Sequence, residues 1–271
     1  MGLICFGSVR SSPGVTATVL ALAARWPTPP PPVVIEADPD GGVLASRYSL
    51  GRAGESPGLT SLATAVRRGL GAGEVWRHAQ ELPGGLALVV GPDSAEAASA
   101  TVRSAGEGLA RWLAVQPDVA ALVDCGRLRP GSPALELVRC ASQLVVVVRP
   151  RVEELQALSQ RLGALRQLTE VGLILVGDRP YGAGEVAKVL GAEILGVIAD
   201  DPRAALALEG DGAAGVKRLR RSALARTAAG LAEQLGARGA IDVDADEGAP
   251  QAPAQPWMSA SAVERAGVVG R

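Results

Sequence analysis

The chain has 271 residues, of which 48% are hydrophobic, 20% charged and only 3% aromatic. This is enough apolar material for one large domain or two small ones, with a core of aliphatic side chains. The formal net charge of −1 excludes both a global polycation that would coat nucleic acid and a strongly acidic, unfolded chain. Arginine supplies nearly all the positive charge, because Lys188 and Lys217 are the only lysines.

The first residues have neither the charged segment nor the apolar stretch of a signal peptide. No apolar run approaches the ~18 residues that a membrane span needs. The cysteines Cys5, Cys125 and Cys140 are widely spaced and favour reduced, buried thiols over disulfides or a metal site. We therefore expect a soluble, cytoplasmic protein with no transmembrane segment.

Short apolar runs alternate along the chain with longer segments of helical periodicity. The predicted strands are 2–7, 33–35, 86–90, 119–123, 144–148, 172–176 and 194–198. The predicted helices are 14–25, 59–69, 95–114, 132–141, 152–168, 182–190 and 215–235. Uniformly apolar strands that alternate with helices predict βαβ units, and therefore a three-layer α/β/α fold around a mostly parallel central sheet.

The periodicity stops near Gly239, after which the sequence is rich in Asp, Ala, Gly and Pro. We therefore predict one α/β domain over residues 1–238 and a disordered C-terminal tail over 239–271. The only histidine, His78, falls in a polar segment, and we expect it at the surface with no acid–base role.

Polar residues follow the predicted strands, where ligands of parallel α/β sheets bind. The first strand leads through a Gly/Ser-rich turn into a helix, and free N–H groups at such a helix start attract anions. The turn almost matches the phosphate-binding pattern G-x-x-x-x-G-K-[ST]. Gly14 and Thr16 fit its end, but Val15 stands where the lysine belongs and Val9 replaces the first glycine.

Three polar blocks follow predicted strands in this order along the chain: R-S-S-P-G-V-T from Arg10, E-A-D-P-D-G-G from Glu36, and D-C-G from Asp124. In this order the sequence resembles the ParA/MinD family of deviant P-loop ATPases over about residues 1–235. The resemblance implies a P-loop NTPase fold, ATP and magnesium as cofactors, and a homodimer. Within the family, the acidic block and the lysine-less loop resemble the TadZ/CpaE-like branch, whose partners are proteins of pilus or secretion machinery.

The resemblance also implies roles for individual residues. Arg10 stands at the signature lysine and Asp38 at the acid that orients the attacking water, which makes them the candidate catalytic residues. The candidate magnesium ligands are Thr16, Glu36 and Asp124. The candidate nucleotide-binding residues are Ser11, Ser12, Pro13, Gly14, Val15, Thr16 and Ala17 in the loop, and Asp178, Asp201 and Pro202 on the side of the base.

Several departures from the family pattern weaken the predicted ATPase. Val15 removes the ammonium group that neutralises phosphate charge, and charge stabilisation is most of what a phosphoryl-transfer enzyme contributes. Ser11 and Ser12 replace glycines that allow close backbone approach, and Pro13 lacks an N–H group. We therefore predict weak or lost hydrolysis, and a pseudo-ATPase that acts as a positioning or assembly factor.

Other interpretations stay open. An active partition-type ATPase could use Arg10 in place of the lysine and bind DNA, or an anionic membrane, through the basic residues of 217–226. A solvated face of an amphipathic helix is the favoured interpretation of that segment. Asp38 and Asp124 could simply cap the turns that follow them. A dinucleotide-dependent oxidoreductase is disfavoured, because no G-x-G-x-x-G follows the first strand.

Overall fold

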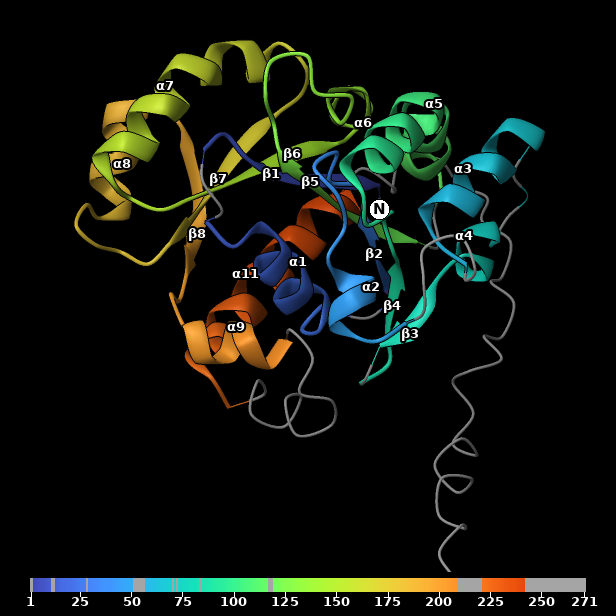
Figure 1. Ribbon diagram of the computed structural model, residues 1–271. Coiled ribbons are helices and arrows are strands. Elements are labelled where there is room, and N and C mark those ends of the chain that lie inside the picture. Colours follow the sequence, from blue (N-terminus) through green and yellow to red (C-terminus); the bar gives the residue numbers. More distant parts are fainter. Residues whose placement is uncertain are drawn as a thin grey trace, which may run out of the picture.

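The computed structural model describes residues 2–10, 13–27, 29–50, 57–69, 71, 73–82, 84–116, 119–208 and 221–241 (Figure 1). The strands are β1 (Leu3–Ser8), β2 (Pro32–Glu36), β3 (Gln80–Leu82), β4 (Leu86–Val89), β5 (Ala120–Arg127), β6 (Gln143–Val148), β7 (Val171–Val176) and β8 (Glu193–Ile198). The helices are α1 (Val15–Ala23), α2 (Leu44–Arg47), α3 (Leu59–Arg68), α4 (Glu74–Arg77), α5 (Ala95–Ala114), α6 (Leu135–Arg139), α7 (Val152–Arg166), α8 (Ala183–Leu190), α9 (Pro202–Leu208) and α11 (Ala223–Ile241).

In the described part of the chain, the strands form one eight-stranded sheet in the order β3-β4-β2-β5-β1-β6-β7-β8. Every neighbouring pair is parallel except β3 and β4, which are antiparallel. The predicted mostly parallel sheet is therefore confirmed. The sequence analysis missed the edge strand β3, because its three residues, Gln-Glu-Leu, contain no apolar run.

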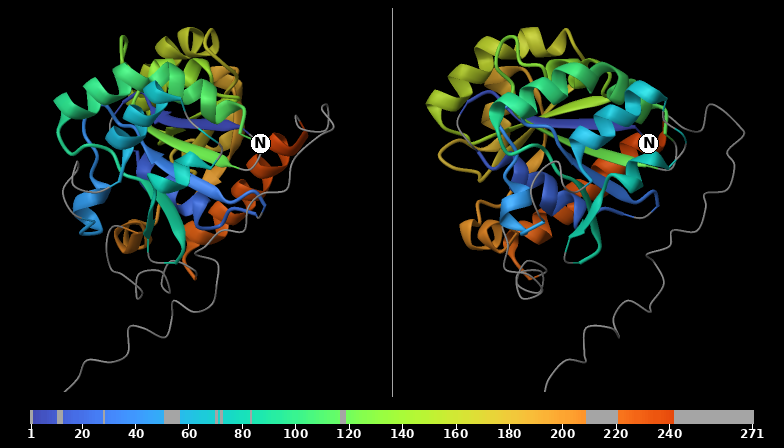
Figure 2. Two further views of the ribbon diagram at one scale, coloured as in Figure 1. Left: turned by 90° about the vertical axis from the view of Figure 1, so that its right-hand side faces the viewer. Right: turned by 45° about the vertical axis from the view of Figure 1, so that its right-hand side comes forward.

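Alternate residues of the central strands face two separate cores, as the pleat of a strand requires. Leu3 and Cys5 of β1 belong to the core beneath α3, α5, α6, α7 and α8. Ile4 and Phe6 belong to the other core, which α1, α9 and α11 cover. Figure 2 shows α1 and α11 on the face of the sheet opposite α5. The predicted three-layer α/β/α architecture is thus confirmed.

Some element boundaries differ from the predicted ones. Strand β5 continues to Arg127, so Asp124 lies within the strand rather than after it. The last helix begins at Ala223 in the described part of the chain, and most of the predicted 215–222 start falls on residues outside that part. The predicted tail also lies outside it from residue 242 onward. None of the described helices combines the length and apolar character needed to cross a membrane.

The expectation that His78 is a surface residue is wrong. Its side chain is only 14% exposed. The residue follows α4 directly, and the Nδ1 atom of its imidazole ring lies 2.8 Å from Ser61 Oγ on α3. The polar segment around His78 therefore turns inward at this position, toward a polar partner that is 17 residues away along the chain.

Candidate functional site

A cavity of about 340 Å³ opens at the carboxyl ends of β1, β2 and β5. It brings together residues that the sequence analysis singled out in three separate blocks: Gly14, Val15, Thr16, Ala17, Glu36, Asp38 and Asp124. Parallel pairing explains this convergence, because the register sets Glu36 of β2 and Phe6 of β1 level with Asp124 of β5.

Helix α1 begins at this cavity, and its N-cap residue, Gly14, has no side chain that could cap the helix. Gly14 occupies the N-cap position with φ +99°, a left-handed conformation that a glycine adopts at little cost. The first-turn N–H groups of a helix have no partner within the helix, and they carry its positive dipole end. Since Val15, Thr16 and Ala17 of this turn line the cavity, its floor is suited to an anion.

Asp124 lies at the centre of the site. Its Oδ2 accepts a hydrogen bond of 2.6 Å from Thr16 Oγ1, and its Oδ1 accepts one of 2.9 Å from the Gly126 N–H. The residue is only 1% exposed. Burial, with a smaller contribution from the charges of Asp38 and Glu36, raises the pKa of this carboxyl to about 7, although the two hydrogen bonds lower it.

Glu36 has both carboxylate oxygens bound by backbone. Its Oε1 accepts hydrogen bonds from the N–H groups of Val43 (2.7 Å) and Leu44 (3.0 Å), and its Oε2 accepts one from Gly91 (3.0 Å). Burial raises the pKa of Glu36 even though these bonds oppose the shift. A Cβ atom at Gly42 would lie 2.5 Å from Oε2, which explains why this block ends in glycine. Glu36 therefore holds the loops after β2 and β4 in place.

Asp38 lies over the backbone of β5. A Cβ atom at Gly126 would come within 2.0 Å of the Asp38 Cγ, so the carboxyl group rests where a side chain would otherwise be. Its Oδ1 accepts a 2.8 Å hydrogen bond from the Asp40 N–H. Burial raises the pKa of Asp38, whereas the nearby Arg129 and Arg127 lower it. The carboxyl groups of Glu36, Asp38 and Asp124 thus line the same cavity, and the charge of each disfavours ionisation of the others.

The positive charge at the cavity comes from residues that the sequence analysis did not single out. Arg47 of α2 and Arg127 at the end of β5 line the cavity, and Arg10, although described and exposed, is not among the lining residues. The one hint of Arg127 in the sequence was that it directly follows the D-C-G block. Arg129 binds Asp40 at 2.5 Å and extends this positive edge outward.

The remaining predicted residues lie elsewhere. Pro13 is buried, and Ser11 and Ser12 are outside the described residues. Asp178 is exposed after β7, and Asp201 accepts a hydrogen bond from the Ala204 N–H at the start of α9, which Pro202 begins. Asp178, Asp201 and Pro202 do not line the 340 Å³ cavity. Near them, Arg149 after β6 binds Asp200 after β8 at 2.7 Å.

The oxygen atoms of Thr16 and Asp124 are of the kind that magnesium binds in proteins. In the described part of the chain, no three His, Cys, Asp or Glu side chains form a preformed metal-binding group. Magnesium does not need one, because it usually retains waters and takes one or two protein oxygens plus phosphate oxygens. Thr16 Oγ1 and Asp124 Oδ2 offer such oxygens beside the α1 N-terminus, so these residues fit a magnesium–nucleotide complex.

No protein-family model and no curated protein matches the chain. Solved structures do. A ParA family ATPase from Chlorobium tepidum TLS is 19% identical, with a TM-score of 0.70 over 86% of this chain and 99% of its own. The septum site-determining protein MinD from Pyrococcus horikoshii OT3, solved with Mg-ADP, is 16% identical, with a TM-score of 0.66 over 89% and 98%.

The MinC:MinD cell division protein complex of Aquifex aeolicus contains a chain that is 14% identical to this one. Its TM-score is 0.61 over 93% of this chain and 99% of its own. These likenesses extend over nearly the whole length of each relative, which excludes a match to an isolated βαβ unit. The chain therefore has the P-loop NTPase fold of the ParA and MinD ATPases.

Proposed function

We propose that this protein is a ParA/MinD-like positioning or assembly factor that binds Mg-ATP weakly and hydrolyses it slowly or not at all. One observation carries the proposal: the anion-binding start of α1 and the Thr16–Asp124 pair are present, but the lysine between them is replaced by Val15. The site thus retains parts for binding a nucleotide and lacks the part that neutralises its phosphates.

The first turn of α1 and the side chains of Thr16 and Asp124 would hold the nucleotide in this arrangement. The N–H groups of the first turn of α1 would bind phosphate oxygens, while Thr16 Oγ1 and Asp124 would hold magnesium directly or through water. Magnesium would neutralise phosphate charge. Asp38, which lines the cavity together with Arg127, would orient a water molecule. Glu36 would support the loops instead of contacting the metal, because both of its oxygens already accept backbone hydrogen bonds.

Arg127 and Arg47 would replace part of the missing positive charge. A guanidinium group binds phosphate well, but an arginine that lines the side of the cavity cannot occupy the place of a lysine in the first turn of α1. The replacement therefore supports binding more than catalysis. Slow or absent hydrolysis follows, because stabilisation of the transferred charge is the main catalytic term.

The biological setting is part of the same proposal. A nucleotide-dependent homodimer in the cytoplasm would present a surface to a protein of a pilus or secretion system, as in the TadZ/CpaE-like branch. Binding of DNA or an anionic membrane through 217–226 is the alternative; residues 217–220 lie outside the described part. Within residues 221–226, which the structure describes, the Arg226 side chain donates a hydrogen bond to the Arg221 carbonyl oxygen.

Calorimetric titration of the full chain tests the proposal. Mg-ATP should bind with a Kd between about 10 μM and 1 mM, that is, about −7 to −4 kcal/mol. Binding should weaken at least tenfold when EDTA removes magnesium or when Asp124 is replaced in Asp124→Asn. Inorganic phosphate release should be at most slightly above the background rate. Failure to bind 5 mM Mg-ATP, or binding that is unchanged in Asp124→Asn, would sink the nucleotide part of the proposal.

A further inference from the structure

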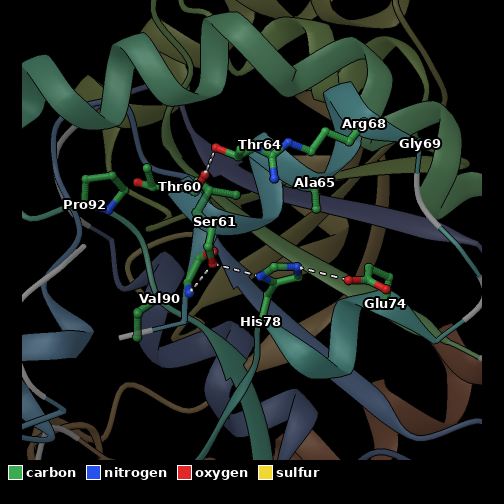
Figure 3. Close-up of a pocket in the computed structure, with 12 residues that line it drawn as sticks. Thr60, Ser61, Thr64, Ala65, Arg68, Gly69, Glu74, His78, Val90 and Pro92 are labelled. Atoms are coloured by element: carbon green, nitrogen blue, oxygen red, sulfur yellow. Dashed lines mark hydrogen bonds and ion pairs between the residues drawn. The ribbon is translucent and has the colours of Figure 1, made fainter. Parts of the chain in front are cut away.

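A second cavity, of about 620 Å³, lies beside the proposed nucleotide site. The two cavities share no lining residue, and the proposed function does not use the second one. Its wall includes Ser61 of α3, His78 after α4, and Glu74 at the start of α4. Figure 3 shows these three side chains in a row, with the imidazole ring between the hydroxyl and the carboxylate. The two cavities adjoin at one loop: Val90 and Pro92 line this one, while the Gly91 N–H binds Glu36.

The distances in the row are those of a nucleophile, a base and an orienting acid. Ser61 Oγ lies 2.8 Å from His78 Nδ1, which is hydrogen-bond distance. His78 Nε2 lies 3.6 Å from Glu74 Oε1, which is an ion-pair distance. Catalytic contacts are often this long before substrate binds. The side chains of His78 and Glu74 are only 14% and 22% exposed, so water screens the pair little.

The hydrogen-bond partners of Ser61 allow two arrangements of the protons in this row. Ser61 Oγ has a single proton and two acceptors within reach, His78 Nδ1 and the Gly58 carbonyl oxygen, each at 2.8 Å. In the neutral imidazole with Ser61 donating to Nδ1, the ring proton sits on Nε2 and faces Glu74. If Ser61 donates to Gly58 instead, Nδ1 carries the ring proton and donates it to Ser61 Oγ.

The first of these arrangements is that of an activated serine, in which a base accepts the hydroxyl proton and an acid orients the base. The Gly58 N–H donates to Ser61 Oγ at 3.1 Å and would stabilise negative charge that develops there. Ser61 also lies in the first turn of α3. The Leu59 N–H there already donates to the Val90 carbonyl oxygen at 2.8 Å, but the N–H groups of Thr60 and Ser61 have no acceptor within the helix and can bind an oxyanion.

We propose that Ser61 is the nucleophile of a second, acyl-transferring site, which hydrolyses small esters in the 620 Å³ cavity. Ser61 Oγ attacks the ester carbonyl carbon and gives its proton to His78 Nδ1. The C–O bond to the alcohol breaks, and the alcohol leaves with that proton. Water then attacks the acyl–serine ester, again with His78 as base, and releases the carboxylic acid. Glu74 is a positioning residue that holds the imidazole ring through Nε2.

The cavity also indicates the kind of ester. Leu59, Ala65, Val90 and Pro92 supply an apolar wall for a short acyl chain, and Arg68 adds a positive charge at the exposed rim. An ester whose acid or alcohol part carries a carboxylate or phosphate group fits this combination best.

Two measurements on the full chain test the proposal. A fluorophosphonate reagent, which loses fluoride to an activated serine hydroxyl, should label Ser61, with the site read by peptide mass spectrometry. Ser94 is the matched control, because it caps α5 through the Ala97 N–H at 3.2 Å and no imidazole contacts it. Hydrolysis of p-nitrophenyl butyrate should fall by about 100-fold or more in Ser61→Ala, the usual contribution of such a nucleophile–base pair.

Ser61→Ala also removes the contacts of Ser61 with Gly58, so a variant that keeps them is needed. His78→Asn places an amide near the position of Nδ1 and cannot act as the base. It should keep the melting temperature within a few degrees and lose both labelling and hydrolysis. Glu74→Gln should lower kcat with KM unchanged. Labelling of Ser94 as fast as Ser61, or hydrolysis that survives in folded His78→Asn, would overturn the proposal. Neither result would affect the proposed nucleotide site.

Discussion

Thr16 Oγ1 on helix α1 donates a hydrogen bond of 2.6 Å to Asp124 Oδ2 on strand β5. The bond joins the anion-binding start of α1 to the most deeply buried carboxyl group of the site, which is 1% exposed. Because burial raises the pKa of Asp124 to about 7, the charged form that would bind magnesium is costly to keep without a cation. The site therefore lowers the stability of the empty protein.

Replacement of Asp124 by asparagine should stabilise the empty protein at neutral and alkaline pH. The pKa in the folded state, about 7, exceeds the 3.8 of an ordinary aspartate, so the folded protein holds this proton more tightly than the unfolded chain. The cost of ionisation is absent below pH 3.8, grows between pH 3.8 and about 7, and is constant above. Asn has no such cost, and the free energy of unfolding at pH 8 should rise by roughly 2–4 kcal/mol.

Urea unfolding of the wild type and Asp124→Asn between pH 4 and pH 8 measures this difference. The gap between the two proteins should be small at pH 4 and largest at pH 8. A gap that is independent of pH would contradict the raised pKa. Mg-ATP at one fixed concentration should stabilise the wild type by at least about 1 kcal/mol more than Asp124→Asn, because stabilisation grows with the logarithm of ligand concentration over Kd.

The place of Asp38 over Gly126 gives a second prediction. Gly126→Ala would put a Cβ atom 2.0 Å from the Asp38 Cγ, and the backbone there has φ +56°. Gly131→Ala is the matched control, since its φ is +75° and a Cβ atom would meet nothing within 4 Å. Both variants should lose about 1 kcal/mol for the left-handed backbone.

Only Gly126→Ala should also displace Asp38, so its total loss of unfolding free energy should exceed that of Gly131→Ala by about 1–3 kcal/mol, a typical cost of overpacking. It should also weaken Mg-ATP binding, whereas Gly131→Ala should bind like the wild type. Thermal unfolding and calorimetry check both points. Equal losses in the two variants would show that Asp38 can move away freely.

The predicted blocks that meet at one cavity are those whose position follows from strand order alone. Thr16 and Asp124 meet because parallel strands bring their carboxyl ends to one edge. Arg47 and Arg127 could not be predicted, because their approach to the cavity depends on the short helix α2 and on the extension of β5 past Asp124. A pattern of apolar residues carries no information about either.

Ser61 and His78 illustrate the same limit. The pair is 17 residues apart, and its contact depends on how α4 turns back on α3. A four-residue helix such as α4, Glu-Val-Trp-Arg, is too short for helical periodicity to be detected. A lone histidine in a polar segment is indistinguishable from a solvated one until that turn is known, so its burial required the structure.

Glu36 should matter more for folding than for ligand chemistry. Glu36→Ala leaves three backbone N–H groups, those of Val43, Leu44 and Gly91, without their acceptor. Each buried donor without a partner costs about 1–3 kcal/mol, so the free energy of unfolding should fall by at least about 3 kcal/mol. Glu154→Ala is the control. Glu154 is also buried, at 5% exposure, but in the part of the chain that the structure describes its carboxylate accepts one hydrogen bond, from the Arg149 N–H.

Chemical denaturation of Glu36→Ala and Glu154→Ala should therefore show losses in a ratio of roughly three to one. If Glu36 were instead a metal ligand with a small structural role, Glu36→Ala would unfold like the wild type and lose magnesium-dependent binding alone. Equal losses in both variants would show that the number of bound N–H groups does not set the cost.

Arg127 and Arg10 can be compared directly as sources of positive charge. Arg127 lines the cavity and Arg10 does not. Arg127→Ala should weaken binding of Mg-ATP, and of tripolyphosphate, by about 10- to 100-fold, the value of one or two charge-assisted hydrogen bonds. Arg10→Ala should change the Kd less than about twofold. A larger loss in Arg10→Ala would restore the sequence-based expectation that Arg10 replaces the missing lysine.

A lysine introduced at position 15 tests whether the missing positive charge limits nucleotide binding. Val15→Lys would place an ammonium group in the first turn of α1, beside Thr16, and a charge-assisted bond to phosphate should tighten Mg-ATP binding at least about tenfold. Val15 is only 7% exposed, so loss of its apolar contacts should lower the free energy of unfolding by about 1–2 kcal/mol.

The control is Val15→Met, which changes the packing at the same position without adding charge. It should bind Mg-ATP as weakly as the wild type. Calorimetry and a phosphate-release assay on both variants separate charge from shape. A gain in binding with no gain in hydrolysis would mean that the departures at Ser11, Ser12 and Pro13 also limit the reaction. No gain in binding would mean that the lysine is not the missing part, and that the cavity has been adapted to a ligand other than a nucleotide.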